Sequence, residues 1–415
     1  MRTTNSIHGE NNIAVTGIGV ISPLGTGREA FWKNVRHARS GIKKITHFDT
    51  SDLRTNIAGW IDDFDPVQFM KPRSFRRLSR ISRMAVAASV DALEDSRLRL
   101  DKVDRERIAI VMGTAYGSSS HVEDFFAGLL AEGPRGSHPF LFPETVPNAP
   151  ASHVAMYHGI TGPNTTFCQN AISAENALCY ARNILSANMA DVVLVGGAEE
   201  LSAMQYACYD AVRALDGTRI SNGSAVTPRI GSGIILGEGA GFLVMERLDS
   251  ALERGADIYG VVRAGVVTGG PAPMGHYEID GRQMVRATKA ALAHAGVGPS
   301  DIGQIDVSAN CSGEVERMEC KRLGELFAGQ KNTLHVTPLK YLMGDFGGAG
   351  ILRAAAILLS IRSGIPLPAI PLQRMENGNG GHPDWQTEGT GNTATALMTS
   401  STFGGGSSSF VFAEV

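Results

Sequence analysis

Short apolar segments that end near a glycine alternate with longer segments of helical periodicity along nearly the whole chain. Apolar runs of this kind are typical of strands that are buried on both faces of a sheet. The predicted strands of the first part cover residues 13–20, 108–112, 191–195, 233–246 and 259–265. The predicted helices cover residues 27–39, 78–93, 174–188 and 249–254. This alternation predicts a layered α/β fold whose sheets are covered by helices.

The second part of the chain repeats this order. Its predicted elements are helices 283–295, 314–327 and 347–362, a strand at 305–308, and a hairpin formed by 394–399 and 409–412. No low-complexity linker separates the two parts, so we expect them to pack as one body.

The charge balance excludes some classes of function. Lys and Arg number 38, Asp and Glu number 41, and the formal net charge of −3 is too near neutral to indicate nucleic-acid binding. The five cysteines show no metal-ligand spacing, and their apolar neighbours predict reduced, mostly buried thiols and no metal site. Residues 1–12 are polar and no apolar run reaches about 18 residues, so we expect a soluble cytoplasmic protein without a membrane partner.

Residues 162–178 predict a short strand, a sharp turn and a helix. A nucleophile in such a turn lies at the helix N-terminus, where the helix dipole and free N–H groups stabilise a thiolate. The turn position is Ala171, whose side chain has no chemistry. The sequence therefore predicts the scaffold of a reaction centre without its nucleophile.

Seven segments support a resemblance to a known family. They are residues 15–25, 48–59, 162–164, 190–200, 235–246, 340–354 and 403–412. In this order they resemble the β-ketoacyl-ACP synthases of the thiolase superfamily over nearly the whole chain. The resemblance implies a duplicated, five-layer α-β-α-β-α fold, with an N-terminal thiolase-like half at 12–250 and a C-terminal half at 251–415.

In that family a cysteine at the turn is acylated, and two histidines promote malonyl decarboxylation. The segments place Ala171 at the cysteine, Asn310 at the first histidine and Asp345 at the second, whereas Lys340 is retained. A carboxylate at 345 would repel the malonyl carboxylate and the enolate oxygen. An amide at 310 can donate a hydrogen bond but cannot shuttle protons. The resemblance therefore implies that no catalytic residue is left.

Two thiols and one carboxylate near these positions have other interpretations. Cys168 precedes the turn and is interpreted as a small buried hydrophobe. Cys311 follows Asn310 at the mouth of the site and is the better candidate nucleophile, but no His or Lys at a recognisable spacing activates it. Glu175 is interpreted as a helix-surface residue or as a partner of nearby basic groups.

Phe140, Leu141 and Phe142 lie between two prolines, which favour an extended loop with large apolar side chains. In the resembled family this loop crosses the dimer interface and closes the acyl pocket; the alternative is that it fills the local core. The further residues predicted for this tunnel or interface are Tyr116, Met204 and Phe403.

A basic run comprises Lys71, Arg73, Arg76, Arg77, Arg80 and Arg83. One interpretation is a solvated helix face. The other is a surface that steers an acidic carrier protein or pairs with acidic residues of a partner subunit.

These features together resemble a chain-length factor, the non-catalytic β subunit of a type II polyketide ketosynthase pair. The resemblance implies a heterodimer with a catalytic ketosynthase, packed through residues 165–169. It also implies a polyketide or polyene substrate on the phosphopantetheine arm of an acyl carrier protein, with no cofactor in this chain. Factors of aromatic systems carry Gln at the turn, so Ala171 leaves the product class open. The alternatives are a free-standing condensing enzyme and a malonyl-ACP decarboxylase with altered residues.

Overall fold

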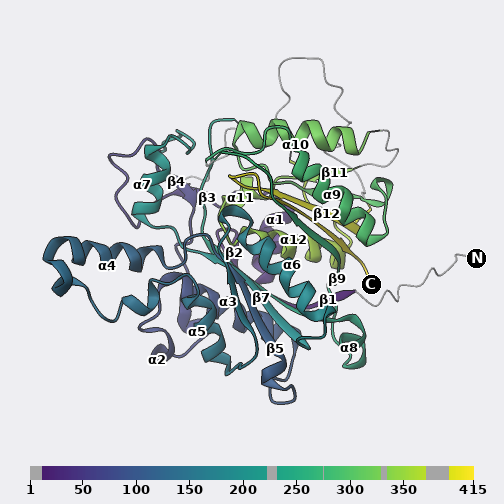
Figure 1. Ribbon diagram of the computed structural model, residues 1–415, viewed down its shortest axis with the longest axis horizontal. Coiled ribbons are helices and arrows are strands. Elements are labelled where there is room, and N and C mark those ends of the chain that lie inside the picture. Colours follow the sequence, from purple (N-terminus) through teal and green to yellow (C-terminus); the bar gives the residue numbers. More distant parts are fainter. Residues whose placement is uncertain (1–11, 222–230, 274, 329–333, 371–391) are drawn as a thin grey trace, which may run out of the picture.

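The computed structural model describes residues 12–221, 231–273, 275–328, 334–370 and 392–415 (Figure 1). The strands are β1 Ile13–Ser22, β2 Gly25–Thr26, β3 Ile42–Lys44, β4 Ile57–Gly59, β5 Ile108–Gly113, β6 Asn164–Phe167, β7 Val192–Glu199, β8 Gly239–Arg247, β9 Gly260–Thr268, β10 Gln304–Asp306, β11 His335–Thr337, β12 Thr395–Ser401 and β13 Ser407–Ala413. The α-helices are α1 Arg28–Arg36, α2 Pro72–Phe75, α3 Arg80–Ser96, α4 Ser119–Glu132, α5 Ala149–His158, α6 Ser173–Ser186, α7 Ala203–Ala211, α8 Leu248–Glu253, α9 Arg282–Ala295, α10 Gly313–Leu326, α11 Lys340–Met343 and α12 Ala349–Ser363.

The main sheet contains the same strand arrangement twice. Its order is β6-β5-β7-β8-β1 followed by β9-β13-β12-β10-β11, with β2 paired to β1. When these ten strands are numbered within each half and read from the outer edge inward, both sets run 3-2-4-5-1. In both, strands 3, 2 and 4 are parallel, whereas strand 5 is antiparallel to its neighbours 4 and 1. The two sets meet where β1 pairs antiparallel with β9. The topology is therefore duplicated, as predicted.

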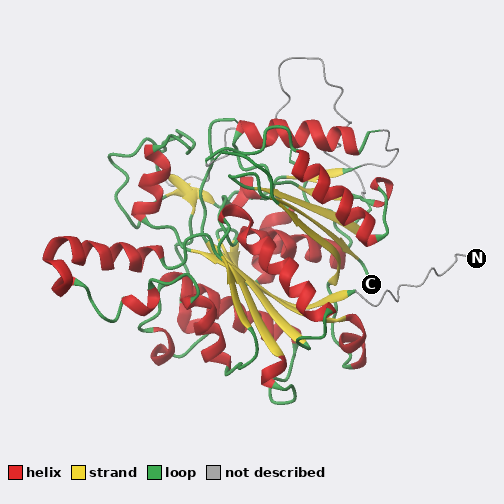
Figure 2. Cartoon of the chain, in the orientation of Figure 1, coloured by secondary structure: helices red, strands yellow, loops and turns green. Residues whose placement is uncertain are grey.

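Helices form three layers around these strands (Figure 2). α3 packs on β1, β7 and β8, with α5 beside it. α6 and α12 lie between the two sets of strands, since α6 contacts β5, β7 and β9, and α12 contacts β7, β8 and β12. α9 covers β9 and β13 on the far side, next to α10. The predicted five-layer α/β architecture is confirmed.

The two edge strands of the main sheet differ in exposure. In β6 the first residue is exposed and the other three are half-buried. All three residues of β11 are buried. One edge of the duplicated sheet is therefore accessible in this chain, and the other is covered.

One predicted strand is shorter than expected. The strand predicted at 233–246 begins only at Gly239. Gly233 and Gly239 have φ angles of 130° and 152°, which side-chain-bearing residues rarely adopt, and regular pairing starts at Gly239, opposite Glu199. Residues before Gly239 instead make isolated bridges, one of which joins Leu236 to Asp345.

Arg353 on α12 is fully buried and joins the middle layer to the second half of the sheet. Its Nε donates to Asp306 Oδ2 on β10 at 2.6 Å. Its Nη1 donates to Ser400 Oγ on β12 at 2.6 Å and to Glu175 Oε1 on α6 at 3.3 Å. A Cβ on Gly350 would lie 2.4 Å from Glu175 Cδ, so a side chain at position 350 would displace this carboxylate.

Arg353→Ala is expected to lower the free energy of unfolding by about 3–5 kcal/mol, because Asp306 and Glu175 become uncompensated buried carboxylates. Arg362→Ala removes a half-exposed arginine from the same helix and is the matched control. It is expected to cost no more than about 1 kcal/mol. Urea unfolding followed by circular dichroism measures both, and equal losses would contradict the structural role of Arg353.

Glu319 on α10 is a second buried carboxyl near this network. Its Oε1 accepts from Ser308 N at 2.9 Å and from Thr399 Oγ1 at 2.8 Å. Its Oε2 has no hydrogen-bond partner among the described residues. Burial raises the pKa of Glu319 from 4.5 to about 7. A proton on Oε2 disrupts neither hydrogen bond.

Because its pKa is raised, Glu319 stabilises the fold most below pH 4.5, and this contribution is lost as the pH rises through about 7. Glu319→Gln removes the titration. The free energy of unfolding of the wild type, minus that of the variant, should therefore fall between these pH values and stay constant above them. His47 and His158, whose pKa values burial lowers to about 4, titrate in both proteins and cancel. A pH-independent difference would contradict the raised pKa.

Candidate functional site

The predicted strand, turn and helix around Ala171 are present. β6 ends at Phe167, and a short turn, Asn170–Ile172, leads into α6. Asn170 has a φ of 47°. Ser173 Oγ closes the turn, because it donates to the carbonyl of Asn170 at 2.7 Å and accepts from the N–H of Gln169 at 2.8 Å. Ala171 lies at the tip of this turn and lines a cavity.

Asn310, Asp345 and Lys340 form one buried cluster. Asn310 Nδ2 donates to Asp345 Oδ2 at 2.6 Å, and Lys340 Nζ forms an ion pair with Asp345 Oδ1 at 2.8 Å. Their exposures are 2%, 5% and 1%. Asp345 lines the same cavity as Ala171. The ammonium balances the charge of the carboxylate, whereas neither Lys340 Nζ nor Asp345 Oδ1 makes a hydrogen bond among the described residues.

The backbone fixes the position of Asp345. α11 ends at Gly344, whose φ of 85° turns the chain toward residues 235–237. The N–H of Asp345 donates to the carbonyl of Ile235 at 2.8 Å, and the N–H of Gly237 donates to the carbonyl of Asp345 at 3.1 Å. Lys340, one turn earlier on α11, is thereby held beside the carboxylate.

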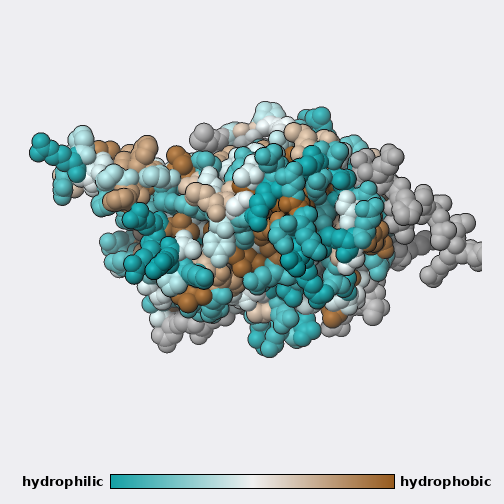
Figure 3. Space-filling model, turned by 90° about the horizontal axis from the view of Figure 1, so that it is seen from below, coloured by the Kyte–Doolittle hydropathy of each residue, from teal (hydrophilic) through white to brown (hydrophobic). Residues whose placement is uncertain are grey.

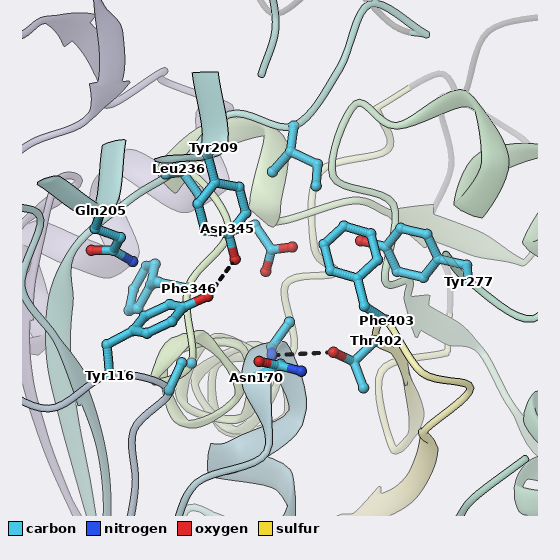
Figure 4. Close-up of a pocket in the computed structure, with 14 residues that line it drawn as sticks. Tyr116, Asn170, Gln205, Tyr209, Leu236, Tyr277, Asp345, Phe346, Thr402 and Phe403 are labelled. Atoms are coloured by element: carbon cyan, nitrogen blue, oxygen red, sulfur yellow. Dashed lines mark hydrogen bonds between the residues drawn. The ribbon is translucent and has the colours of Figure 1, made fainter. Parts of the chain in front are cut away.

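The N–H groups at the start of α6 are engaged inside the chain. The N–H of Ala171 donates to Thr402 Oγ1 at 3.3 Å (Figure 4). The N–H of Ala174 donates to the carbonyl of Gly347 at 3.0 Å. An oxyanion hole needs preorganised N–H donors that point at the reacting atom. Here the donor of the turn residue has a protein partner instead.

The cavity at the turn is small. Its volume is about 30 Å³, and its wall includes Ala171, Asp345, Tyr116 and Tyr209. The two tyrosine hydroxyls lie 2.7 Å apart (Figure 4). Burial raises the pKa of both tyrosines, so both stay neutral near pH 7. The space holds about two water molecules.

A larger cavity of about 1010 Å³ adjoins the small one. Tyr116, Tyr209 and Phe403 contribute to both walls. The wall of the larger cavity also includes Arg213 and Arg317. The predicted tunnel residues Tyr116 and Phe403 are therefore brought together with Ala171, Asn310 and Asp345.

The other predicted tunnel residues lie elsewhere. Phe140 and Phe142 are 64% and 61% exposed in the loop between α4 and α5, so the alternative that they fill the local core is wrong. Leu141 is half-buried. Met204 lies in the first turn of α7 and is exposed, and it does not line either cavity. Figure 3 shows the projecting arm around α4, where apolar residues are exposed among hydrophilic ones.

Several interpretations of single residues require correction. Cys168, expected to be buried, is exposed in this chain, as is Cys208. Cys311 is 1% exposed, and burial and nearby carboxylates raise its pKa, so it is not an activated nucleophile. Glu175 is not on the helix surface; it is fully buried, and the prediction of a basic partner is confirmed by Arg353.

The basic run divides into two parts. Residues 71–77 are mostly exposed, as a solvated face requires. Arg80 is not part of such a face, because its Nη2 lies 2.6 Å from Glu238 Oε1 and its guanidinium lies 4.4 Å from the ring centre of Trp60. Arg83 is half-buried, and its Nε donates to the carbonyl of Leu78. The two C-terminal arginines therefore have structural roles.

Sequence reasoning missed four residues around the site. Tyr209 and Tyr277 line the cavity, and Thr402 binds the turn. Glu199 lies behind Tyr116 and accepts from the N–H groups of Ala115 and Tyr116. Burial raises the pKa of Glu199 to about 7. Only their positions in the sequence could have indicated two of these residues. Glu199 lies within the segment 190–200 and Thr402 directly precedes the segment 403–412, and both segments carry the family resemblance.

The described ranges lack two kinds of feature. None of their helices has the length and apolar character needed to cross a membrane. None of their His, Cys, Asp and Glu side chains gather in threes as metal ligands would.

Known proteins share this fold and these segments. The chain matches "Beta-ketoacyl synthase, N-terminal domain" over residues 10–251 and "Beta-ketoacyl synthase, C-terminal domain" over residues 259–373. It is 31% identical to 3-oxoacyl-(acyl-carrier-protein) synthase 2 of Vibrio cholerae, over 89% of this chain and 91% of the relative. It is 30% identical to the tetracenomycin polyketide synthase ketoacyl synthase alpha subunit of Streptomyces glaucescens, over 98% of both chains.

A solved structure gives the same result. A chain of the ishigamide ketosynthase/chain length factor is 25% identical, with a TM-score of 0.83 and coverage of 98% of this chain and 100% of the other. With the duplicated sheet and the turn at Ala171, these matches lead to one conclusion: the chain belongs to the β-ketoacyl synthase family.

Proposed function

We propose that this chain is a non-catalytic chain-length-factor subunit, which pairs with a catalytic ketosynthase and shapes the tunnel for a growing polyketide or polyene chain. The observation that carries the proposal is the neutralised cluster of Asn310, Asp345 and Lys340 beside Ala171. Condensation needs a nucleophile and stabilisation of a developing anion. The turn offers only a methyl group, and the cluster offers a carboxylate.

The small cavity supports the same proposal. Its volume of about 30 Å³ beside Ala171 is enough for about two water molecules. The N–H of Ala171, bonded to Thr402, is likewise not presented to a substrate. In this proposal the acyl carrier protein delivers its phosphopantetheine-bound chain to the partner subunit. We assign residues 12–250 and 251–415 to the two thiolase-like halves, neither with a cofactor.

The edge strand β6 supports the proposed pairing. It is an end of the main sheet and is incompletely buried in the single chain. Cys168 next to it and Tyr180 on α6 are exposed as well. Open strand edges associate or aggregate unless something covers them. A stable pair of this kind buries roughly 2,000 Å² or more. The likeness to a ketosynthase/chain length factor structure supports the kind of partner.

A free-standing condensing enzyme is the second candidate, because relatives of this chain carry the name of 3-oxoacyl-(acyl-carrier-protein) synthase 2. It would need a nucleophile other than residue 171, and Cys311 is buried with a raised pKa. A malonyl-ACP decarboxylase is disfavoured, because Asn310 cannot transfer a proton and Asp345 would repel the malonyl carboxylate.

Neither the wild-type chain nor Ala171→Cys is expected to elongate an acyl-ACP with malonyl-ACP in the absence of a partner. The new thiol would lack groups that decarboxylate the extender, and Asp345 would repel the malonyl carboxylate. Product analysis by mass spectrometry measures elongation. Intact-protein mass spectra compare acylation, with the wild type as the control for its exposed thiols at Cys168 and Cys208. Elongation by either chain alone would show that the proposal is wrong.

Phe140→Ala and Phe142→Ala, each co-expressed with the partner ketosynthase, are expected to lengthen the product or broaden its length distribution. Truncation of a side chain at a tunnel wall opens space for another two-carbon unit. If each ring is buried against the partner, its loss costs about 3–5 kcal/mol of complex stability.

Product mass spectra and melting curves of the purified complexes measure the two effects separately. Phe126→Ala, which removes an exposed ring from α4 outside the loop, is the matched control and should leave product length unchanged. Unchanged length in both loop variants would contradict the tunnel-wall assignment.

A further inference from the structure

The exposed aromatic loop of the arm contains one deeply buried charge. Phe140 and Phe142 are 64% and 61% exposed, whereas Glu144, two residues after Phe142, is 4% exposed. The carboxylate of Glu144 is therefore buried, whereas the two aromatic rings close to it in the sequence remain exposed to solvent. Burying a carboxylate is costly unless hydrogen bonds and charges compensate it.

Glu144 is compensated by groups from two helices. Its Oε2 accepts from the N–H of Ser79 at 3.3 Å, from Ser79 Oγ at 3.0 Å and from Ser82 Oγ at 3.2 Å. Ser79 is the N-cap of α3, so the carboxylate lies at the positive end of that helix. His153 Nε2 on α5 donates to Oε1. These partners keep the pKa of Glu144 below its usual value despite burial.

The same serine extends the connection to the arm helix. Ser79 Oγ lies 2.9 Å from Ser118 Oγ, and Ser118 is the residue at which α4 begins. Glu144 thus joins the loop to the starts of α3 and α4 and to α5. An exposed loop with this many buried polar contacts at a single residue is anchored, not loosely packed.

Weaker contacts hold the two rings. The ring centres of Phe142 and Phe125 are 5.9 Å apart. The guanidinium of Arg77 lies 5.2 Å from the ring centre of Phe140. Neither contact covers its ring, because both rings stay more than half exposed. Without a stronger anchor, two large apolar side chains would collapse onto the nearest apolar surface.

We infer that Glu144 is the positioning residue that holds Phe140 and Phe142 outward for contact with the partner subunit. The inference rests on the proposed function for the identity of the partner. The anchoring itself depends only on contacts within this chain. Specificity for product length then depends on a carboxylate that does not itself touch the tunnel.

Hydrogen–deuterium exchange of the full-length chain tests the anchor. In Glu144→Ala, peptides covering residues 139–146 are expected to exchange at least about tenfold faster, because several hydrogen bonds to a charged group are lost. Exchange in β5 and β7 should stay unchanged. Glu132→Ala removes an exposed carboxylate from the same arm and should behave as the wild type. His153→Gln keeps a donor for Oε1 and should retain most of the protection.

Pairing with the ketosynthase is then titrated for the same variants. Glu144→Ala is expected to bind at least about tenfold more weakly than Glu132→Ala, since disordering the loop adds an entropic cost to binding. Unchanged exchange at 139–146, faster exchange throughout β5 and β7, or unchanged pairing despite a loosened loop would each overturn the inference. If the wild-type chain itself fails to pair, the proposed function is wrong, and the exchange data still decide whether Glu144 anchors the loop.

Discussion

The buried cation of Arg353 is the constraint on which the rest of the structure depends. Removing a guanidinium from water is costly, and Asp306 and Glu175 together compensate that cost. Asp306 precedes Asn310 by one short segment of chain, and Glu175 follows Ala171 by one helical turn. The ion network therefore fixes both chain segments that carry the site. Substitution of side chains at the surface of the cavity would leave this support beneath it intact.

In the cluster of Asn310, Asp345 and Lys340, a buried cation is likewise compensated by a carboxylate. Lys340 is fully buried, and an unpaired ammonium there would be strongly destabilising. Asp345 supplies the counter-charge, and Asn310 occupies the second carboxylate oxygen. The charges of Lys340 and Asp345 thus compensate each other, and Asn310 donates a hydrogen bond to the carboxylate. The charges of this cluster are therefore balanced within the chain, although Lys340 Nζ and Asp345 Oδ1 make no hydrogen bond among the described residues.

Most of the fold was predictable, because strands buried on both faces require continuous apolar runs and such runs are visible in the sequence. The turn at Ala171 was predictable because its strand and helix are adjacent in the chain. α4 was not predicted: Phe126 and Leu130 remain exposed, so the helix lacks a clear division between an apolar and a polar face. The Glu175–Arg353 pair was also hidden, since its members are 178 residues apart and no local pattern links them.

The unequal edges of the duplicated sheet limit what the molecule can build. β6 and β11 hold equivalent positions in the two sets of strands, yet β11 is buried and β6 is partly open. A chain with two open edges could add a neighbour at each end and grow into a fibre. In this chain only β6, of the two edge strands, is partly open, so a partner that paired with β6 would cover it. A partner that paired with β6 would therefore leave β11, the buried edge, as the other end of the main sheet and would limit growth along the sheet.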